Sequence, residues 1–385
     1  MSLANSPSVT RWTCLVVSAL VANLAACDSS TPSPADAAAA DTPAADRTTP
    51  PDSAPPADAG DVPQPPPDMV PPTDGGGDVP ADAPVGPTMR TRPIVSCGSV
   101  CTRPLDAIPD SRGANVYFTA FAADGRPGVF RAAVPAEGMP PATPTAVMVS
   151  DSFEFPVGIA ISNDDATLYV ADQTATRGME VGIGAVFSLP AAGGMPTVVS
   201  VGDVLVHPVS ITVSADGNEL LVAGQERVTM DMNIDLQRAL FRVPRAGGTA
   251  MRVTNDLVDP SGVSQTASGT ILCHDTRRGG TRSATAVSIN AMGAVTNFAG
   301  GLVANYPAGL SHSMDGSRVL FSGADPTVGP GLLTLAGGAA PMATSDLSAG
   351  MERPLGLHRA RMADAWAVAD EAAAESGQVF MVTMR

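Results

Sequence analysis

Short apolar runs recur along most of the chain at a nearly constant spacing, and each series of runs opens with a proline. The leading prolines stand at positions 104, 156, 208, 260, 307 and 354, in steps of 52, 52, 52, 47 and 47 residues. Pro156-Val-Gly-Ile159 is typical of the phrases that they open, and Pro104-Leu-Asp-Ala107 is a degenerate first copy. A period near 50 residues indicates one supersecondary unit that is repeated six times.

The second copy shows most clearly how apolar runs and turns alternate within a repeat. Turns rich in Gly, Asp, Asn and Pro separate four runs, which are Ile159-Ala-Ile161, Leu168-Tyr-Val170, Ala185–Leu189 and Thr197–Val201. Runs of about five residues with such punctuation are typical of β-strands. In other copies, Asp-Gly dipeptides at 216–217 and 315–316 supply the positive φ that tight hairpins require. The pattern therefore predicts four strands in each repeat.

Six repeats of four strands predict an all-β fold, a six-bladed β-propeller that spans residues 89–385. The last copy ends after its third run, Val379–Val382. A fourth strand is available near the start of the propeller, because Thr91–Ser96 precedes Pro104 as Thr197–Val201 precedes Pro208. We expect the last blade to be closed by strands from both termini, which removes an exposed sheet edge.

Residues 1–27 have the features of a secretory signal. Arg11 is followed by an apolar stretch from Trp12 to Ala26, which is too short for a permanent membrane span. The segment Leu24-Ala-Ala-Cys27 resembles the lipobox of bacterial lipoproteins. That resemblance implies cleavage before Cys27, lipidation of Cys27 and anchoring to a membrane. The alternative is an ordinary signal peptide that happens to contain a cysteine.

Residues 28–88 form a low-complexity segment that we expect to be a disordered linker. Residues 28–87 contain 16 prolines, 11 aspartates and one arginine. Such a segment cannot bury enough apolar surface to offset its chain entropy. Its charge of 1 − 11 = −10 makes up most of the net charge of −16, so the propeller itself is only mildly acidic.

Three cysteines fall within the predicted propeller. Cys97 and Cys101 could form a small disulfide outside the cytoplasm, since residues near them offer no further metal ligands. Cys273 aligns with core positions of other repeats and is predicted to be a buried core residue. The chain has no lysine and no basic stripe, which argues against nucleic-acid binding.

The phrase Pro-x-Gly-Ile, followed by Asp-Gly and by Leu-Tyr-Val-Ala-Asp, resembles the repeats of two six-bladed families, the NHL-repeat proteins and the gluconolactonases. NHL propellers are largely binding scaffolds, whereas the lactonases use a metal ion whose ligands stand before the blade glycine. The corresponding residues here are Leu105, Val157, Val209, Ser261, Ala308 and Leu355. Because a hard divalent ion needs oxygen ligands, the resemblance implies that the lactonase site is missing, and we expect no metal and no cofactor. Asp106, one residue away, leaves that question open.

The loops before the leading prolines are predicted to surround the central channel, where we place a ligand site. The candidate ligand-binding residues at this mouth are Arg103, Asp106, Phe155, His207, Asp259, Tyr306, Arg353 and His358. Aromatic, acidic and basic groups together suit a small polar ligand or a peptide. The alternative is an ordinary solvated loop rim. Asp172, Asp275 and Asp370 end second strands, where aspartate more often binds the next turn.

The function that we expect is a non-enzymatic binding scaffold of the cell envelope, monomeric and held at a membrane through Cys27. Its partner would be an envelope protein, a peptide or a glycan, and the outer membrane or cell surface is favoured over the inner membrane. The alternative is a hydrolase or lyase with a non-standard site around Asp106, Glu154 and His207. An enzyme should cluster acid and base groups within hydrogen-bond reach in the channel, whereas a scaffold should not.

Overall fold

The structure is a computed structural model, and it describes residues 88–201, 204–227, 236–280, 283–336, 342–343 and 345–384. The predicted signal segment 1–27 with its lipidation site Cys27, and the predicted linker up to residue 87, lie outside the described residues. Within the described part, no helix has the length and apolar character needed to cross a membrane.

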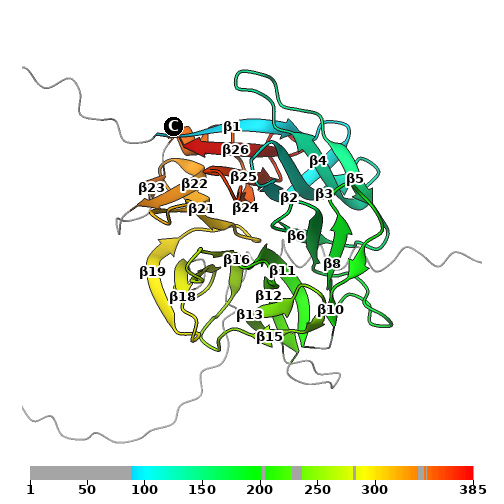
Figure 1. Cartoon of the computed structure of the whole chain (residues 1–385). Helices are drawn as coiled ribbons and strands as arrows, with labels where there is room; N and C mark the ends of the chain where they lie inside the picture. Colours follow the sequence, from blue (N-terminus) through cyan, green and yellow to red (C-terminus); the bar gives the residue numbers. More distant parts are fainter. Residues whose placement is uncertain are drawn as a thin grey trace, which may run out of the picture. The chain divides into compact units, whose positions relative to one another are not determined.

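Six four-stranded antiparallel sheets are arranged as the blades of a propeller, as the repeats predict (Figure 1). Blade 1 consists of β2 (Cys101–Pro109), β3 (Asn115–Ala122), β4 (Pro127–Ala133) and β5 (Thr145–Val149). Blade 2 consists of β6 (Pro156–Ile161), β7 (Thr167–Asp172), β8 (Ala185–Pro190) and β9 (Thr197–Val198). Blade 3 consists of β11 (Leu205–Val213), β12 (Glu219–Arg227), β13 (Leu236–Pro244) and β15 (Met251–Arg252).

The remaining blades follow the same order from the innermost strand outward. Blade 4 consists of β16 (Pro260–Gln265), β17 (Ile271–Asp275), β18 (Ala284–Ile289) and β19 (Val295–Leu302). Blade 5 consists of β20 (Leu310–His312), β21 (Arg318–Asp325), β22 (Gly329–Ala336) and β23 (Met342–Ala343). Between blades 2 and 3, β10 (Ser200–Val201) pairs in parallel with β14 (Gly248–Thr249). The short helix α2 (Ser345–Ser348) precedes blade 6.

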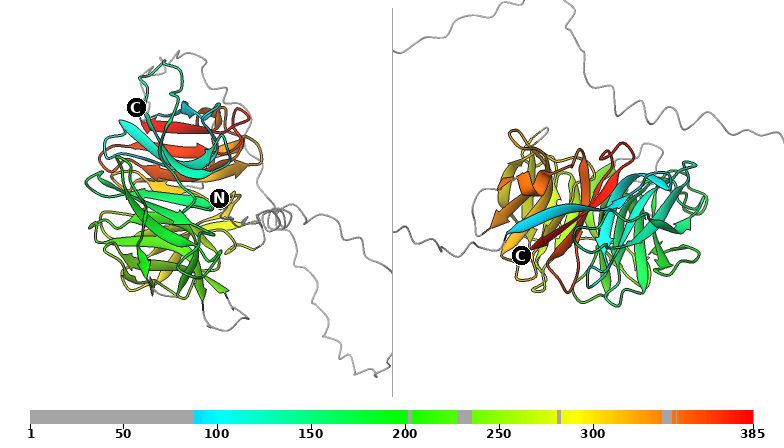
Figure 2. Two further views of the ribbon diagram at one scale, coloured as in Figure 1. Left: turned by 90° about the vertical axis from the view of Figure 1, so that its right-hand side faces the viewer. Right: turned by 90° about the horizontal axis from the view of Figure 1, so that it is seen from above.

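Blade 6 is closed by strands from the two ends of the propeller, as predicted. Its order is β24 (Pro354–Arg359), β25 (Ala365–Asp370), β26 (Gln378–Met384) and β1 (Met89–Ser96). Figure 2 shows the N-terminal strand, coloured blue to cyan, beside the red C-terminal strands. A disulfide between Cys97 and Cys101 then joins the end of the closing strand to the first strand of blade 1. This bridge confirms the predicted pairing of the two cysteines.

The core lies between adjoining sheets, where the second strand of each blade contributes a fully buried side chain at the same place in the repeat. These side chains are Phe118, Val170, Val222, Cys273, Phe321 and Val368. Cys273 is therefore a core residue, as predicted, and burial raises the pKa of its thiol well above the usual value. The repeated apolar runs of the sequence are thus the surfaces through which the blades pack.

One polar side chain in this core lacks the hydrogen bonds that burial demands. His274 of β17 has no exposed surface, and both of its ring nitrogens lack a hydrogen-bond partner within the described residues. Its ring lies edge-on to Phe321, with 5.9 Å between the ring centres. Burial favours the neutral imidazole and lowers the pKa of His274 to about 4.

We expect the stability of the propeller to fall as the pH drops from about 6.5 towards 4. In this window the unfolded chain protonates His274 while the folded chain does not, and the shift from 6.5 to about 4 corresponds to about 3 kcal/mol. Urea unfolding of the full chain at several pH values would measure the slope. His274→Leu removes this titrating group and should make that slope shallower, and the remaining slope belongs in part to His312, whose pKa is also lowered to about 4. An equally steep slope in the variant would contradict this assignment.

Candidate functional site

The predicted mouth residues from blades 1, 2 and 6 come together around one acidic side chain. Glu371 binds Arg103 through Oε2 at 3.3 Å and Arg353 through Oε1 at 2.5 Å. Both arginine side chains are 54% exposed, whereas the glutamate is almost buried. The Arg103 guanidinium also lies over the Phe121 ring, which packs against Phe155 with 5.9 Å between ring centres. This cluster carries one more positive than negative charge.

A matching cluster on blades 3, 4 and 5 contains the predicted residues Asp259 and Tyr306. The two oxygens of the buried Asp259 carboxylate bind Arg238 Nε at 3.1 Å and Arg277 Nε at 3.2 Å. Arg238 also donates to the Tyr306 hydroxyl at 2.8 Å and lies over its ring. Burial raises the pKa of Tyr306 to about 12, so the phenol stays protonated. The mouth therefore holds two separate arginine–carboxylate–arginine clusters, and not one ring.

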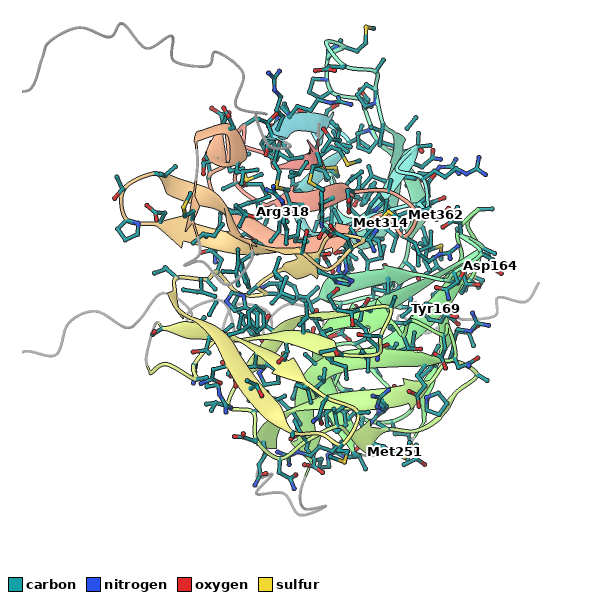
Figure 3. All side chains as sticks on the ribbon, turned by 60° about the vertical axis from the view of Figure 1, so that its left-hand side comes forward. Asp164, Tyr169, Met251, Met314, Arg318 and Met362 are labelled. Atoms are coloured by element: carbon teal, nitrogen blue, oxygen red, sulfur yellow. A yellow bond between two sulfur atoms is a disulfide. The ribbon has the colours of Figure 1, made fainter. Side chains whose placement is uncertain are left out.

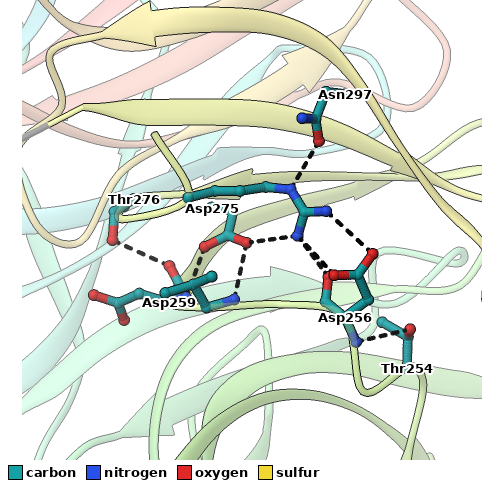
Figure 4. Close-up of polar contacts among 8 residues, drawn as sticks. Thr254, Asp256, Asp259, Asp275, Thr276 and Asn297 are labelled. Carbon is teal, nitrogen blue, oxygen red and sulfur yellow. Dashed lines mark hydrogen bonds and ion pairs between the residues drawn. The ribbon is translucent and has the colours of Figure 1, made fainter. Parts of the chain in front are cut away.

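Buried aspartates at the ends of second strands hold the mouth loops in place, in addition to the following turn that the sequence predicts, where Asp172 accepts the N–H groups of Thr174 and Ala175. The Asp172 carboxylate accepts backbone N–H groups from Glu154 and Phe155, which precede the leading proline, at 2.7 and 2.9 Å. Asp370 binds the corresponding pair in blade 6. Asp275 accepts the N–H of Asp259 in the same way, and Figure 4 shows these two side chains beside Thr276. The pre-proline residues are therefore positioned by the blade itself.

His207 and Glu154 make contacts of their own outside both clusters. His207 is half-buried with φ at 45°, and its Nδ1 lies 3.1 Å from the carbonyl oxygen of Gln173. Burial lowers the pKa of His207. Glu154 accepts a hydrogen bond from the Thr176 hydroxyl. Asp106, the third member of the alternative catalytic group, instead binds His358 and the backbone of Ile159.

The six positions that would hold metal ligands in a lactonase lie buried around the propeller axis. Four of them, Leu105, Val157, Val209 and Leu355, belong to one apolar cluster. The Ser261 hydroxyl accepts the N–H of Ala308 in the next blade at 2.8 Å. The channel is therefore filled by side chains at this level. Within the described residues, no three His, Cys, Asp or Glu side chains are grouped so that they could hold a metal ion.

Asp106 and His358 lie deep on the axis rather than at the exposed mouth. Asp106 Oδ2 lies 3.0 Å from His358 Nε2 and accepts the N–H of Ile159 at 2.9 Å, so it joins blades 1, 2 and 6. Asp106 occupies the place in the phrase that Gly356 holds in blade 6, and a methyl group at Gly356 would overlap its carboxylate. The glycine and the aspartate are thus complementary.

A large cavity, lined by described residues, opens on the face opposite the predicted mouth. Its volume is about 740 Å³, and the ends of the first strands and the turns that follow them form its wall. The side chains that matter most to its chemistry are Glu219, Arg242, Ser264, His312, His358 and Arg359. Sequence reasoning missed this site because it considered only the loops at the other end of the blades. The signal in the sequence that could have revealed the cavity is the polar character of the first strands at their C-terminal ends.

Hydrogen bonds between turns of different blades hold the rim of this cavity together. Five such contacts join blades to one another: Ser111 N to Asp165 Oδ1 at 2.9 Å, Met362 N to Ser111 O at 2.8 Å, Arg361 Nη2 to Asn163 O at 2.6 Å, Ala215 N to Gln265 Oε1 at 2.8 Å and Met314 N to Asp364 Oδ1 at 2.7 Å. Met314 and Met362, labelled in Figure 3, add exposed apolar side chains to these turns. The rim is therefore shaped before any ligand arrives.

Ser264, His312 and Arg359 come from three successive blades and form a cluster in the cavity wall. Ser264 Oγ lies 2.9 Å from His312 Nδ1. Burial, assisted by the positive charge of Arg359, lowers the pKa of His312 to about 4, so its imidazole is neutral at physiological pH. Burial also lowers the pKa of Arg359 below the usual arginine value. This cluster offers hydrogen-bond donors and one fixed positive charge.

Comparison with known proteins identifies the architecture. No family model matches the chain, and no curated protein sequence matches it. A gluconolactonase from Xanthomonas campestris is 12% identical, with a TM-score of 0.51 over 77% of this chain and 90% of its own. The PQQ domain of pyranose dehydrogenase from Coprinopsis cinerea is 13% identical, with a TM-score of 0.50 over 77% of this chain and 95% of its own.

A third solved structure, TolB from Acinetobacter baumannii, is 10% identical with a TM-score of 0.45. That match covers 74% of this chain and 56% of TolB, so the chain spans about half the length of that relative. At such low identities these likenesses concern the fold alone, because one fold supports many activities. The chain is a six-bladed β-propeller, and its fold is similar to that of a solved gluconolactonase structure.

Proposed function

We propose that this propeller is a non-enzymatic binding scaffold of the bacterial envelope, and that it takes a polar ligand into the cavity opposite the pre-proline loops. The observation that carries the proposal is the cavity itself, about 740 Å³ in volume with a polar wall and a hydrogen-bonded rim. Concave sites with a few converging polar groups are the usual places for ligand binding. A rim that is already ordered loses little conformational entropy when a ligand binds.

Filling the cavity mouth should abolish ligand capture without unfolding the protein. Ser268 is exposed on the turn after β16 and lines the cavity, so Ser268→Trp places a large side chain at its entrance. Thr197→Trp, on an exposed outer strand away from the cavity, is the matched control. In affinity capture from solubilised envelope material, we expect the control to retain the partners of the unmodified chain and Ser268→Trp to lose them. Retention by both variants would reject the cavity as the binding site.

The membrane anchor is a separate part of the proposal and rests on the sequence Leu24-Ala-Ala-Cys27. Several acyl chains on one cysteine hold a protein stably at a bilayer, whereas a single chain holds it weakly. We expect Cys27→Ser to move the protein out of the membrane fraction. Density-gradient separation of the two membranes would test the preference for the outer membrane or cell surface. A full-length variant that stays in the membrane fraction would contradict lipidation.

Hydrolysis is the second candidate function, and the contact between Ser264 and His312 favours it. In such a reaction, His312 Nδ1 would accept the hydroxyl proton as Ser264 Oγ attacks a carbonyl carbon. Because the pKa of His312 is lowered to about 4, this base is weak at neutral pH, which favours binding over catalysis. Loss of ester hydrolysis in Ser264→Ala, with cavity binding intact, would reverse that preference.

A further inference from the structure

Arg359 is a partly buried cation in the cavity wall, and no carboxylate of the described residues forms an ion pair with it. Its Nη1 donates to the carbonyl oxygens of Ala360 at 2.6 Å, Arg361 at 3.3 Å and Ala363 at 3.1 Å, all in the turn that follows β24. Its Nε is buried and has no hydrogen-bond partner within the described residues. Nη1 thus fixes the side chain to the turn and Nε is closed off from solvent, which leaves the N–H donors of Nη2 for another group.

The acidic side chains of the cavity wall already have donors of their own. Asp165 accepts hydrogen bonds from the backbone and hydroxyl of Ser111. Glu219 pairs with Arg242 at 2.8 Å. Asp216 accepts the Ser214 hydroxyl, together with the backbone and side-chain N–H groups of Asn218. These acids are therefore engaged in local contacts that hold the turns together.

Asp364 is the acidic residue whose charge acts most directly on Arg359. It raises the pKa of Arg359, but desolvation has the larger effect and the pKa remains lowered. Its Oδ1 accepts the backbone N–H of Met314 at 2.7 Å, and no ion pair joins it to Arg359 within the described residues. Burial of the guanidinium is thus only partly compensated by the protein.

We propose that the cavity binds a ligand through a single carboxylate, which docks on the free side of the Arg359 guanidinium beside His312 and Ser264. This inference rests on the proposed function of the cavity and specifies its ligand. Hydrogen bonds from the charged guanidinium to a carboxylate are stronger than those to a neutral group. Arg242 pairs with Glu219 and Arg361 donates to the Asn163 carbonyl, so Arg359 supplies the positive charge beside His312 and Ser264, and a monoanion balances it. The carboxylate can belong to a small organic acid or to the C-terminus of a peptide.

Isothermal titration calorimetry of the full chain at low ionic strength tests this assignment. The probes are lactate, the tripeptide Ala-Ala-Ala, its C-terminal amide and inorganic phosphate. We expect a carboxylate probe to bind at least about tenfold more tightly than the amide, since hydrogen bonds to charged groups are the stronger ones. Inorganic phosphate tests whether the site prefers a monoanion, and we expect it to bind more weakly than the carboxylate. Preference for lactate would indicate a small acid as the ligand, and preference for the tripeptide would indicate a chain end.

Two arginine variants separate the proposed contact from a general charge effect. Arg359→Gln should abolish the preference for carboxylate over amide. Arg318→Gln, which removes the same charge outside the cavity wall, should keep it. Because Arg359 also holds its turn, thermal melting of each variant is measured. Arg359→Lys is a third variant, since it keeps the charge without the guanidinium and should bind the carboxylate more weakly than wild type while still preferring it to the amide.

Several outcomes would overturn the carboxylate assignment. These are equal affinity for acid and amide in the wild type, an unchanged preference in Arg359→Gln, tighter binding of phosphate, or failure of both carboxylate probes to bind at millimolar concentration. The Ser268→Trp variant distinguishes this failure from failure of the proposed function. If the wild type binds acid and amide equally and Ser268→Trp blocks both, the cavity binds ligands but their charge is misassigned. If it leaves binding of the acid intact, the cavity is not the site.

Discussion

Deletion of residues 28–97 should unfold the propeller, whereas deletion of residues 28–86 should leave its stability unchanged. The longer deletion removes β1, which pairs with β26 from Met89 to Ser96 and closes blade 6. Ile94 and Val95 in that strand have no exposed surface. Each buried aliphatic side chain contributes roughly 1.5–3 kcal/mol, and a folded domain is stable by only about 5–15 kcal/mol. Thermal unfolding of the two truncated chains, followed by circular dichroism, would measure the difference.

The longer deletion also removes Cys97, so the contribution of the disulfide needs its own control. A chain that lacks residues 28–86 and carries Cys97→Ala with Cys101→Ala keeps the strand but loses the bridge. Because the bridge closes a very short loop, we expect this variant to remain folded, with a melting temperature between those of the two deletions. Equal melting of the long and short deletions would disprove closure of the ring by β1.

Asp370→Asn should destabilise the propeller by about 3 kcal/mol, since it replaces a fully buried acceptor that binds four backbone N–H groups. Those groups belong to Glu352, Arg353, Ala372 and Ala373, so the carboxylate holds the mouth loop and the following turn together. The amide of asparagine keeps one oxygen but directs an N–H₂ group at donors. Urea unfolding at neutral pH would give the change in free energy.

Asp216→Asn is the matched control for that substitution. Asp216 also accepts several hydrogen bonds, and these lower its pKa to about 2, but it is exposed on a turn where water can replace a lost contact. We expect a much smaller loss of stability than at Asp370. Comparable losses in the two variants would mean that burial of the strand-end aspartate contributes nothing to stability.

The residues on the propeller axis explain why this chain can share the fold of the lactonases without the metal ligands that the family resemblance places at those positions. Side chains at these positions converge because equivalent residues of a ring face the same axis. In this chain Leu105, Val157, Val209 and Leu355 meet there and pack into an apolar cluster. A divalent ion would need oxygen ligands at those places. We therefore place binding at the opposite end of the axis, where the first strands become polar.

The mouth illustrates how far equivalent positions in a repeat can predict a site. Arg103, Phe155 and Arg353 do come together, because residues at one place in the repeat converge in space. Their central partner Glu371 lies in the loop after β25, where no repeat phrase marks it. Arg238 and Arg277 were missed for the same reason. Contacts between different places in the repeat depend on loop geometry, which periodicity does not contain.

Apolar runs and turn residues are local signals repeated six times, so the six blades, their four strands, the closing strand and the core position of Cys273 follow from the sequence alone. Even the alanine-rich segment around Trp366 follows the repeat and forms β25 instead of a helix. The contact between Asp106 and His358 on the axis is evident only in the folded chain, and so is the cavity that Ser264, His312 and Arg359 share. These residues lie about 50 to 250 positions apart in the chain. Their meeting depends on how each blade is rotated against the next, and that rotation follows from side-chain packing between whole sheets.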